Sequence, residues 1–326
     1  MSTEKRKEVI LGTSMGYTFE MIKPYIVTLQ KSGFKGDLCL FVSQMPKESY
    51  KILRDYGVKL IPFVDHYPYL PKSLFSDELD LKNSFNQISV KYLRYLMYYL
   101  FLLKNGGNYS KVMLSDVKDI IFQRDPFDFG LNGGLYCFLE DNQVTLKNSP
   151  FNSGRILRHF GNEVLEQIGD HYPSCAGTIF GGVPEILDYL KNMIELIKTI
   201  DPVGGGDQGL HNYLIYSGRL KNLKLVDNKK GPVFTVGSEI RHKIRFNKKG
   251  LVINDLGEVV NTVHQYDRHP DLFDGFLRKY QLKVPMEFYL KVIYFMKSII
   301  ENIVGWDFFN QAGWKLVNRL KYWKPK

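Results

Sequence analysis

The stretch Val9-Ile10-Leu11-Gly12-Thr13-Ser14-Met15-Gly16 decides the fold, because a short aliphatic run ends there in small, turn-forming residues. A helical pattern follows over residues 19–31, and a second apolar run covers residues 38–42. Residues 47–56 repeat the helical pattern, and residues 58–64 form a third apolar run. Strands that alternate with helices are typical of a parallel sheet with crossover helices. The sequence therefore predicts an α/β fold with helices on both faces of a mostly parallel sheet.

The predicted loop after the first strand is the first candidate for a binding site. Ligands of open α/β sheets bind beyond the carboxyl ends of the strands, so the segment from Gly12 to Tyr17 is expected at the edge of a nucleotide site. The segment contains neither GxGxxG nor GxxxxGK[ST]. This absence argues against a dinucleotide-binding fold and against a P-loop.

Composition restricts the class of protein further. The chain has 326 residues, with 44% hydrophobic and 24% charged residues, which excludes a disordered or collagen-like chain. Its length suits one large domain with an appendage. There are 44 Lys and Arg against 34 Asp and Glu, a net charge of +10. An excess of positive charge favours an anionic partner: a phosphate-bearing ligand, nucleic acid or an anionic membrane.

Cysteine usage and the N-terminus bear on location. Cys39, Cys137 and Cys175 have no CxxC spacing, so neither a structural zinc site nor a disulfide framework is expected. Residues 1–8 are polar and lack the apolar core of a signal peptide. The longest apolar run, near residues 95–103, is about half of what a spanning helix needs. We expect a cytoplasmic protein without a signal peptide or a transmembrane helix.

A long apolar helix is predicted from a capping box at residues 84–87 to about Lys104. Lys91 and Arg94 are three residues apart on it and share one face. A cation within an apolar helix is costly unless an anion meets it. Either side chain can instead extend to solvent. Arg94 is the better candidate for a diphosphate or carboxylate partner.

The most informative segment is residues 112–127, where an apolar strand leads into Asp116 and Asp119 within one turn. Carboxylates at the end of a buried strand must be solvated, paired or bound to a metal. Hard cations such as Mg²⁺ and Mn²⁺ prefer carboxylate oxygen and keep positions open for phosphate. A capped turn, with one Asp bound to backbone amides, is the structural alternative.

Three later motifs add candidates. Small residues surround Ala176-Gly177, and the glycine-rich stretch 204–206 precedes Asp207-Gln208, which could bind sugar hydroxyls. Asp207 could equally be the N-cap of a helix. His264 follows an alternating apolar run and is predicted at a strand end, where its imidazole would complete a metal site with two carboxylates. A buried histidine with only a structural role is the alternative.

Together these segments resemble the nucleotide-diphospho-sugar transferases of GT-A architecture, and glycosyltransferase family 8 in particular. The resemblance covers roughly residues 8–270 through the order of the motifs. The acids are spaced Asp116-x-x-Asp119 rather than D-x-D, and the residues that follow align Asp119 with the second, metal-binding acid of the family. The resemblance implies a metal site and a donor site. The metal ligands would be Asp116, Asp119 and His264; donor contacts would come from Leu11, Gly12, Thr13, Tyr17, Arg94, Asp116, Ala176 and Gly177.

The resemblance also implies a reaction. A Mn²⁺- or Mg²⁺-dependent enzyme would move a sugar from a nucleotide-diphospho-sugar to a hydroxyl of a glycan, glycoprotein or lipid-linked acceptor. A UDP-sugar is the expected donor and a GDP-sugar the alternative. Asp207 would be the base in an inverting enzyme, whereas Asp207 and Gln208 would orient the donor in a retaining enzyme, the outcome that the likeness favours. A sugar-nucleotide-forming nucleotidyltransferase and a non-catalytic basic membrane-binding module are the rival functions.

The C-terminal residues differ from the rest. We expect a catalytic domain at 1–285 and a basic, aromatic helical tail at 286–326, which holds all three Trp and a net charge of 7 − 3 = +4. Helices with basic and aromatic faces suit an anionic membrane surface, so peripheral membrane association is expected unless the helices pack on the domain. Nucleic acid is not an expected partner, because no stacking motif or DNA-binding module appears.

Overall fold

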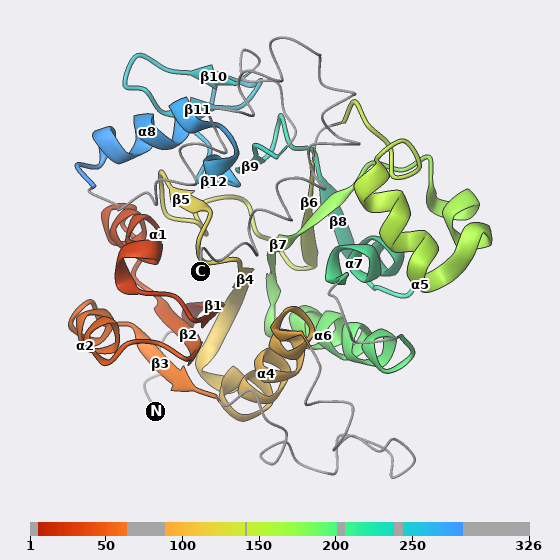
Figure 1. The fold of residues 1–326 in the computed structure, drawn as a ribbon, viewed down its shortest axis with the longest axis horizontal. Coiled ribbons are helices and arrows are strands. Elements are labelled where there is room, and N and C mark those ends of the chain that lie inside the picture. Colours follow the sequence, from red (N-terminus) through yellow and green to blue (C-terminus); the bar gives the residue numbers. More distant parts are fainter. Residues whose placement is uncertain (1–5, 64–88, 141, 201–205, 238–243, 283–326) are drawn as a thin grey trace, which may run out of the picture.

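The computed structural model describes residues 6–63, 89–140, 142–200, 206–237 and 244–282. A seven-stranded sheet with the order β3-β2-β1-β4-β7-β6-β8 forms its centre (Figure 1). Neighbouring strands are parallel except at β7, which is antiparallel to both β4 and β6. The strands are β1 (Lys7–Met15), β2 (Asp37–Ser43), β3 (Lys59–Pro62), β4 (Tyr109–Ser115), β6 (Leu135–Leu139), β7 (Ser174–Gly182) and β8 (Leu223–Val226).

Helices cover both faces of this sheet. On one face α1 and α2 join their apolar residues to those of β1, β2 and β4. On the other face α4, α6 and α7 form a second apolar cluster, and Figure 1 shows α4 and α6 side by side. The helices are α1 (Phe19–Lys31), α2 (Lys47–Asp55), α4 (Val90–Asn105), η3 (Gly106–Asn108), α5 (Pro150–Ile168), α6 (Val183–Lys198), α7 (Asp207–Tyr216), η5 (Tyr266–Arg268) and α8 (Pro270–Lys279).

The first strand explains why both faces need cover. Val9 and Leu11 pack into the cluster with α4 and α6, whereas Ile10 between them packs against α1. All three side chains are fully buried. Side chains alternate across a strand, so an uninterrupted aliphatic run requires an apolar layer on each side. The predicted α/β fold with a mostly parallel sheet is confirmed.

A small second sheet lies beside the main one and carries the candidate histidine. Its order is β5-β12-β9, with β5 (Ile120–Phe122) antiparallel and β9 (Val233–Thr235) parallel to β12 (Thr262–His264). A hairpin of β10 (Arg245–Phe246) and β11 (Val252–Ile253) and the helix α8 lie close by, at the top of Figure 1. Because the sequence after β4 leads directly into β5, the two sheets meet at the acidic segment.

Two predicted boundaries were wrong. The first strand does not turn at Gly12 but pairs with β2 as far as Met15, and the turn comes at Gly16, which has a φ of +69°. The small residues at 12–14 fit a tight interior, since a Cβ on Gly12 would lie 2.5 Å from Cγ2 of Val117. The helix α4 begins at Val90 with Ser89 as its N-cap, and the predicted capping box at 84–87 lies outside the described residues.

The predicted tail at 286–326 also lies outside the described residues, so its boundary stays a prediction. None of the helices in the described part of the chain combines the length and the apolar character that a membrane crossing requires.

Candidate metal centre

Three candidate residues converge where the two sheets meet. Asp116 directly follows β4, and Asp119 directly precedes β5. His264 ends β12, where it pairs with Ile120, the residue after Asp119. The tertiary register therefore brings His264, 145 positions further along the chain than Asp119, to the same turn. The predicted strand-end position of His264 is confirmed.

The ligand atoms of these three residues form a compact group. Nε2 of His264 lies 3.6 Å from Oδ2 of Asp116 and 3.6 Å from Oδ1 of Asp119, and all three atoms lie within 4.8 Å of one another. Distances of 3.6 Å are too long for normal hydrogen bonds. His264 is fully buried, and its Nε2 has no hydrogen-bond partner within the described residues. Two carboxylate oxygens and an imidazole nitrogen form a donor set that could hold a metal ion.

Gly177 provides the space for this group. It lies in β7 opposite the acidic turn, and its carbonyl accepts a hydrogen bond from the backbone N–H of Asp116. A Cβ at this position would lie 2.5 Å from Cε1 of His264 and 2.6 Å from Oδ2 of Asp116. Any other residue would therefore displace one of the ligands. The predicted donor contacts of Ala176 and Gly177 stay predictions; the structure shows that Gly177 leaves the space that His264 and Asp116 occupy.

Arg94 joins the acidic turn to the start of α7. Its guanidinium donates to Oδ1 of Asp116 at 2.6 Å, to Oδ2 of Asp207 at 2.7 Å and to the carbonyl of Ala176 at 3.2 Å. Its side chain is 13% exposed. The expected anionic partner of Arg94 is thus a pair of carboxylates of the same chain. This cation fixes Asp116 so that its second oxygen faces His264.

The electrostatics of the centre follow from these contacts. Burial opposes ionisation of Asp116, but Arg94 and His264 outweigh it and hold the pKa of that carboxyl well below its ordinary value. Burial would lower the pKa of His264, yet Cys175, Asp119 and Asp116 raise it well above its ordinary value. The acids thus attract positive charge to one point, which either a divalent cation or an imidazolium can supply.

Asp207 and Gln208 are occupied by protein contacts. Asp207 is the first residue of α7 after Gly206, so it is not the N-cap that the alternative interpretation required. Gln208 accepts a hydrogen bond from the backbone N–H of Ala176 and donates to Oε1 of Glu140 and to the carbonyl of Ser174. Both N–H groups of the Gln208 amide are therefore bonded within the protein. No N–H of this side chain is left for the predicted contact with sugar hydroxyls.

The predicted donor contacts in and just after the first strand differ in whether they lie near the acids. Leu11 is fully buried and Gly12 lies between neighbouring strands, so neither presents a side chain to the centre. The hydroxyl of Thr13 shares a 2.8 Å hydrogen bond with that of Tyr98. Tyr17 lies nearer the acids: burial, and then the charges of Asp116 and Asp119, raise its pKa to about 12. Its phenol therefore remains protonated, a hydrogen-bond donor beside the centre.

Residues outside the predicted set of site residues complete the surroundings. Arg268 lies 3.8 Å from Oδ2 of Asp119, and burial together with the charge of Asp119 raises the pKa of Asp267. Glu140, just after β6, also has a raised pKa because it is buried. Cys175 contacts the ring of His264. Glu140 follows a strand as Asp116 does, and Asp141 stands next to it in the sequence, so a pair of acids after an apolar run was the signal that could have found it.

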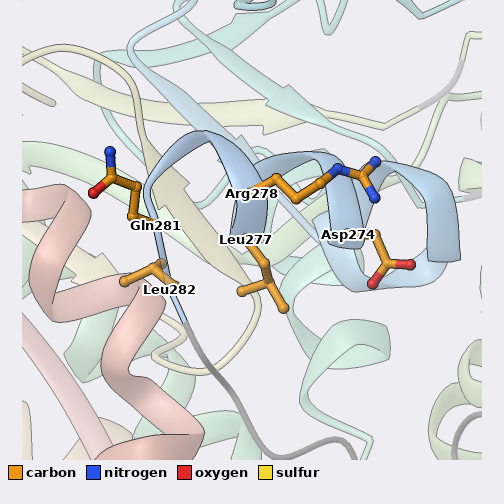
Figure 2. Close-up of a pocket in the computed structure, with 5 residues that line it drawn as sticks. All are labelled: Asp274, Leu277, Arg278, Gln281 and Leu282. Atoms are coloured by element: carbon orange, nitrogen blue, oxygen red, sulfur yellow. The ribbon is translucent and has the colours of Figure 1, made fainter.

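A pocket elsewhere on the molecule does not belong to this centre. It lies on α8 and the residues just after it, close to α1 (Figure 2), and is lined by Asp274, Leu277, Arg278, Gln281 and Leu282. The metal-ligand candidates are absent from its lining. The charged groups that converge at the acidic turn therefore lie apart from this pocket.

No protein-family model and no curated protein matches the chain.

Proposed function

We propose that the chain is a divalent-metal-dependent glycosyltransferase of GT-A architecture, resembling family 8. It would transfer a sugar from a nucleotide-diphospho-sugar, with UDP as the expected nucleotide, to a hydroxyl acceptor. The sheet supports this proposal at the level of the fold class, because a mostly parallel sheet with helices on both faces is what that architecture requires. The order of the motifs along the chain supplies the second support.

One observation carries the proposal: a buried imidazole nitrogen without a hydrogen bond faces the carboxylates of Asp116 and Asp119. A capped turn would leave the acids bound to backbone amides, and a structural histidine would have both nitrogens bonded. The arrangement instead suits a cation held at the carboxyl end of β4, where ligands of open α/β sheets bind.

A bound Mn²⁺ or Mg²⁺ would supply positive charge that neutralises a departing diphosphate. The residues of the chain have separate tasks. Arg94 orients Asp116, while Arg268, 45% exposed beside Asp119, is positioned to attract a phosphate oxygen. Tyr17 keeps its proton and can donate a hydrogen bond to an anionic ligand.

The contacts of Asp207 favour the retaining course over the inverting one. A general base must accept a proton from the acceptor hydroxyl. Oδ2 of Asp207 already accepts from Arg94, and the side chain is 13% exposed. An oxygen that is already bonded to a guanidinium and withdrawn from solvent is poorly placed to meet an acceptor hydroxyl. In this proposal Asp207 holds Arg94 in place, and Gln208 holds the backbone at Ala176.

The experiment is to measure sugar transfer and donor hydrolysis over a panel of UDP- and GDP-sugars with and without Mn²⁺. We expect Asp119→Ala to abolish both activities while the circular dichroism spectrum stays unchanged. Asp128→Ala is the matched control, because this exposed acid beside Arg124 lies outside the centre. Full activity in a folded Asp119→Ala variant would overturn the proposal.

Other outcomes identify the rivals. Release of pyrophosphate from a nucleoside triphosphate and a sugar phosphate would indicate a nucleotidyltransferase. Absence of metal-dependent nucleotide binding in calorimetry would indicate a non-catalytic module. Binding of the full chain, but not of residues 1–311, to anionic liposomes would support a membrane-proximal acceptor.

A further inference from the structure

The second ring nitrogen of His264 faces a cysteine. Nδ1 lies 3.5 Å from Sγ of Cys175, within hydrogen-bond distance for sulfur. Cys175 is in β7, two residues from Gly177, and its side chain is buried. The two nitrogens of one imidazole thus point to opposite environments, one toward two carboxylates and the other toward a thiol.

This geometry restricts the tautomer that can bind a cation. A neutral imidazole has one N–H and one lone pair, and the nitrogen that binds a metal must offer its lone pair. If Nε2 binds the cation, Nδ1 carries the proton. The neighbour of Nδ1 must then accept a hydrogen bond, which the sulfur of Cys175 can do.

Two neighbours of Cys175 bear on the role of its sulfur. Nε2 of Gln265 donates to Sγ of Cys175 at 3.9 Å, so the sulfur already acts as a hydrogen-bond acceptor. The carboxyl group of Glu140 lies close to the same thiol and is held by Nε2 of Gln208, 3.0 Å from its Oε1. A carboxylate beside a thiol can accept the thiol proton in a hydrogen bond, which leaves the sulfur lone pairs for Gln265 and His264.

We propose that Cys175, oriented by Glu140, is a positioning residue that holds His264 in the tautomer with a lone pair on Nε2. The inference rests on the proposed metal site and deepens it. Outer partners that accept the second N–H of a metal-bound histidine fix its ring and its tautomer, and their loss typically weakens metal affinity 10- to 100-fold. In this chain a cysteine backed by a carboxylate has that role.

The chain contains a matched control. Cys137 is also fully buried, but burial is the sole influence on its pKa, and it lies in the apolar cluster with α4 and α6. Replacing Cys137 removes a buried sulfur without touching the centre. Any effect specific to Cys175 must therefore come from its polar contacts.

The test is a titration of the full chain with Mn²⁺ alone, followed by electron paramagnetic resonance of the free ion. We expect Cys175→Ala to weaken binding by roughly 10- to 100-fold. Cys175→Ser should recover most of it, because a hydroxyl can accept from Nδ1 and donate to Glu140. Cys137→Ala should bind as the wild type does. Equal affinity of wild type and a folded Cys175→Ala variant would overturn the inference.

Two further measurements separate the possible failures. Asp119→Ala in the same titration reports on the site itself: retained Mn²⁺ affinity there would overturn both the site and the inference. Lost affinity in Asp119→Ala with full affinity in Cys175→Ala would overturn the role of Cys175 alone. Nitrogen-15 NMR of wild-type protein with Zn²⁺ needs no variant, and a proton on Nε2 of His264 in that complex would overturn the inference.

Discussion

Two histidines, His211 in α7 and His264 in β12, are equally buried and have opposite surroundings. Nδ1 of His211 is 2.9 Å from the hydroxyl of Tyr189, and its Nε2 is 3.0 Å from that of Ser174. His264 has one nitrogen against Cys175 and the other against two carboxylates at 3.6 Å. Burial by itself therefore does not distinguish a structural histidine from a candidate ligand.

The electrostatic consequences also differ. Burial, and then the nearby charge of Arg94, lower the pKa of His211 to about 3, so this ring is neutral near pH 7. Cys175, Asp119 and Asp116 raise the pKa of His264 despite the same burial. Arg94 lies between the two regions, repelling a proton from His211 and binding Asp116 and Asp207. The candidate site therefore differs from the structural histidine in one respect: a ring nitrogen without a hydrogen bond lies near two carboxylates.

The largest expected effect comes from removing the residue that links both regions. Arg94→Met would leave Asp116 and Asp207 without their cation. Breaking a buried ion pair by removing one partner costs about 3–5 kcal/mol. Urea unfolding of wild type and variant measures the loss, with Arg124→Met as the control at an exposed pair with Asp128. A loss below that of the control would show that Arg94 does not hold the two regions together.

The second prediction exchanges each histidine for glutamine. His264→Gln removes a ligand, so we expect Mn²⁺ affinity to fall by roughly 100-fold or more, beyond the usual effect of outer partners. His211→Gln should leave metal affinity unchanged but lower stability by about 1–3 kcal/mol, because buried hydroxyls lose a partner. Calorimetry and urea unfolding give the two values. Equal loss of metal affinity in both variants would contradict the distinction.

The smallest effect is the loss of stability that His211 causes between pH 7.5 and pH 5, about 2 kcal/mol. Its pKa is about 3 in the folded protein and about 6.5 ordinarily, so the unfolded chain binds more protons between these values. The stability that neutral His211 contributes is present above pH 6.5 and is lost as pH falls toward 3, by about 1.4 kcal/mol per pH unit. Unfolding of wild type at pH 7.5 and 5 measures it, and His211→Gln should show a shallower slope.

Much of the fold could be predicted because local pattern and tertiary structure agree. The helices at 19–31 and 47–55 and their intervening strands follow directly from apolar periodicity and from the stops near Gly33 and Gly57. The extent of the first strand could not be predicted, because Gly12 and Ser14 are residue types that are common in turns. In the structure both residues are buried within β1, and a Cβ on Gly12 would lie 2.5 Å from Cγ2 of Val117.

The candidate site shows the same division. Asp116 and Asp119 stood out because two acids follow an apolar strand within one turn, and His264 because it ends another strand. Glu140 also follows an apolar run, with Asp141 beside it, but nothing in the sequence relates Glu140 or Cys175 to His264. Their relation to His264 depends on β7 lying between β4 and β6, which places residues of distant segments together.

By itself the sequence determined the layered α/β class and the residues able to hold a cation, because aliphatic periodicity and ligand chemistry are local properties. The tertiary structure decided what those residues do. In the fold Arg94 binds two carboxylates, and protein groups accept both N–H bonds of Gln208. One nitrogen of His264 faces Asp116 and Asp119 without a hydrogen bond. Hydrogen-bond partners and burial arise from contacts between distant segments, so the choice between a structural group and a site emerges from the fold.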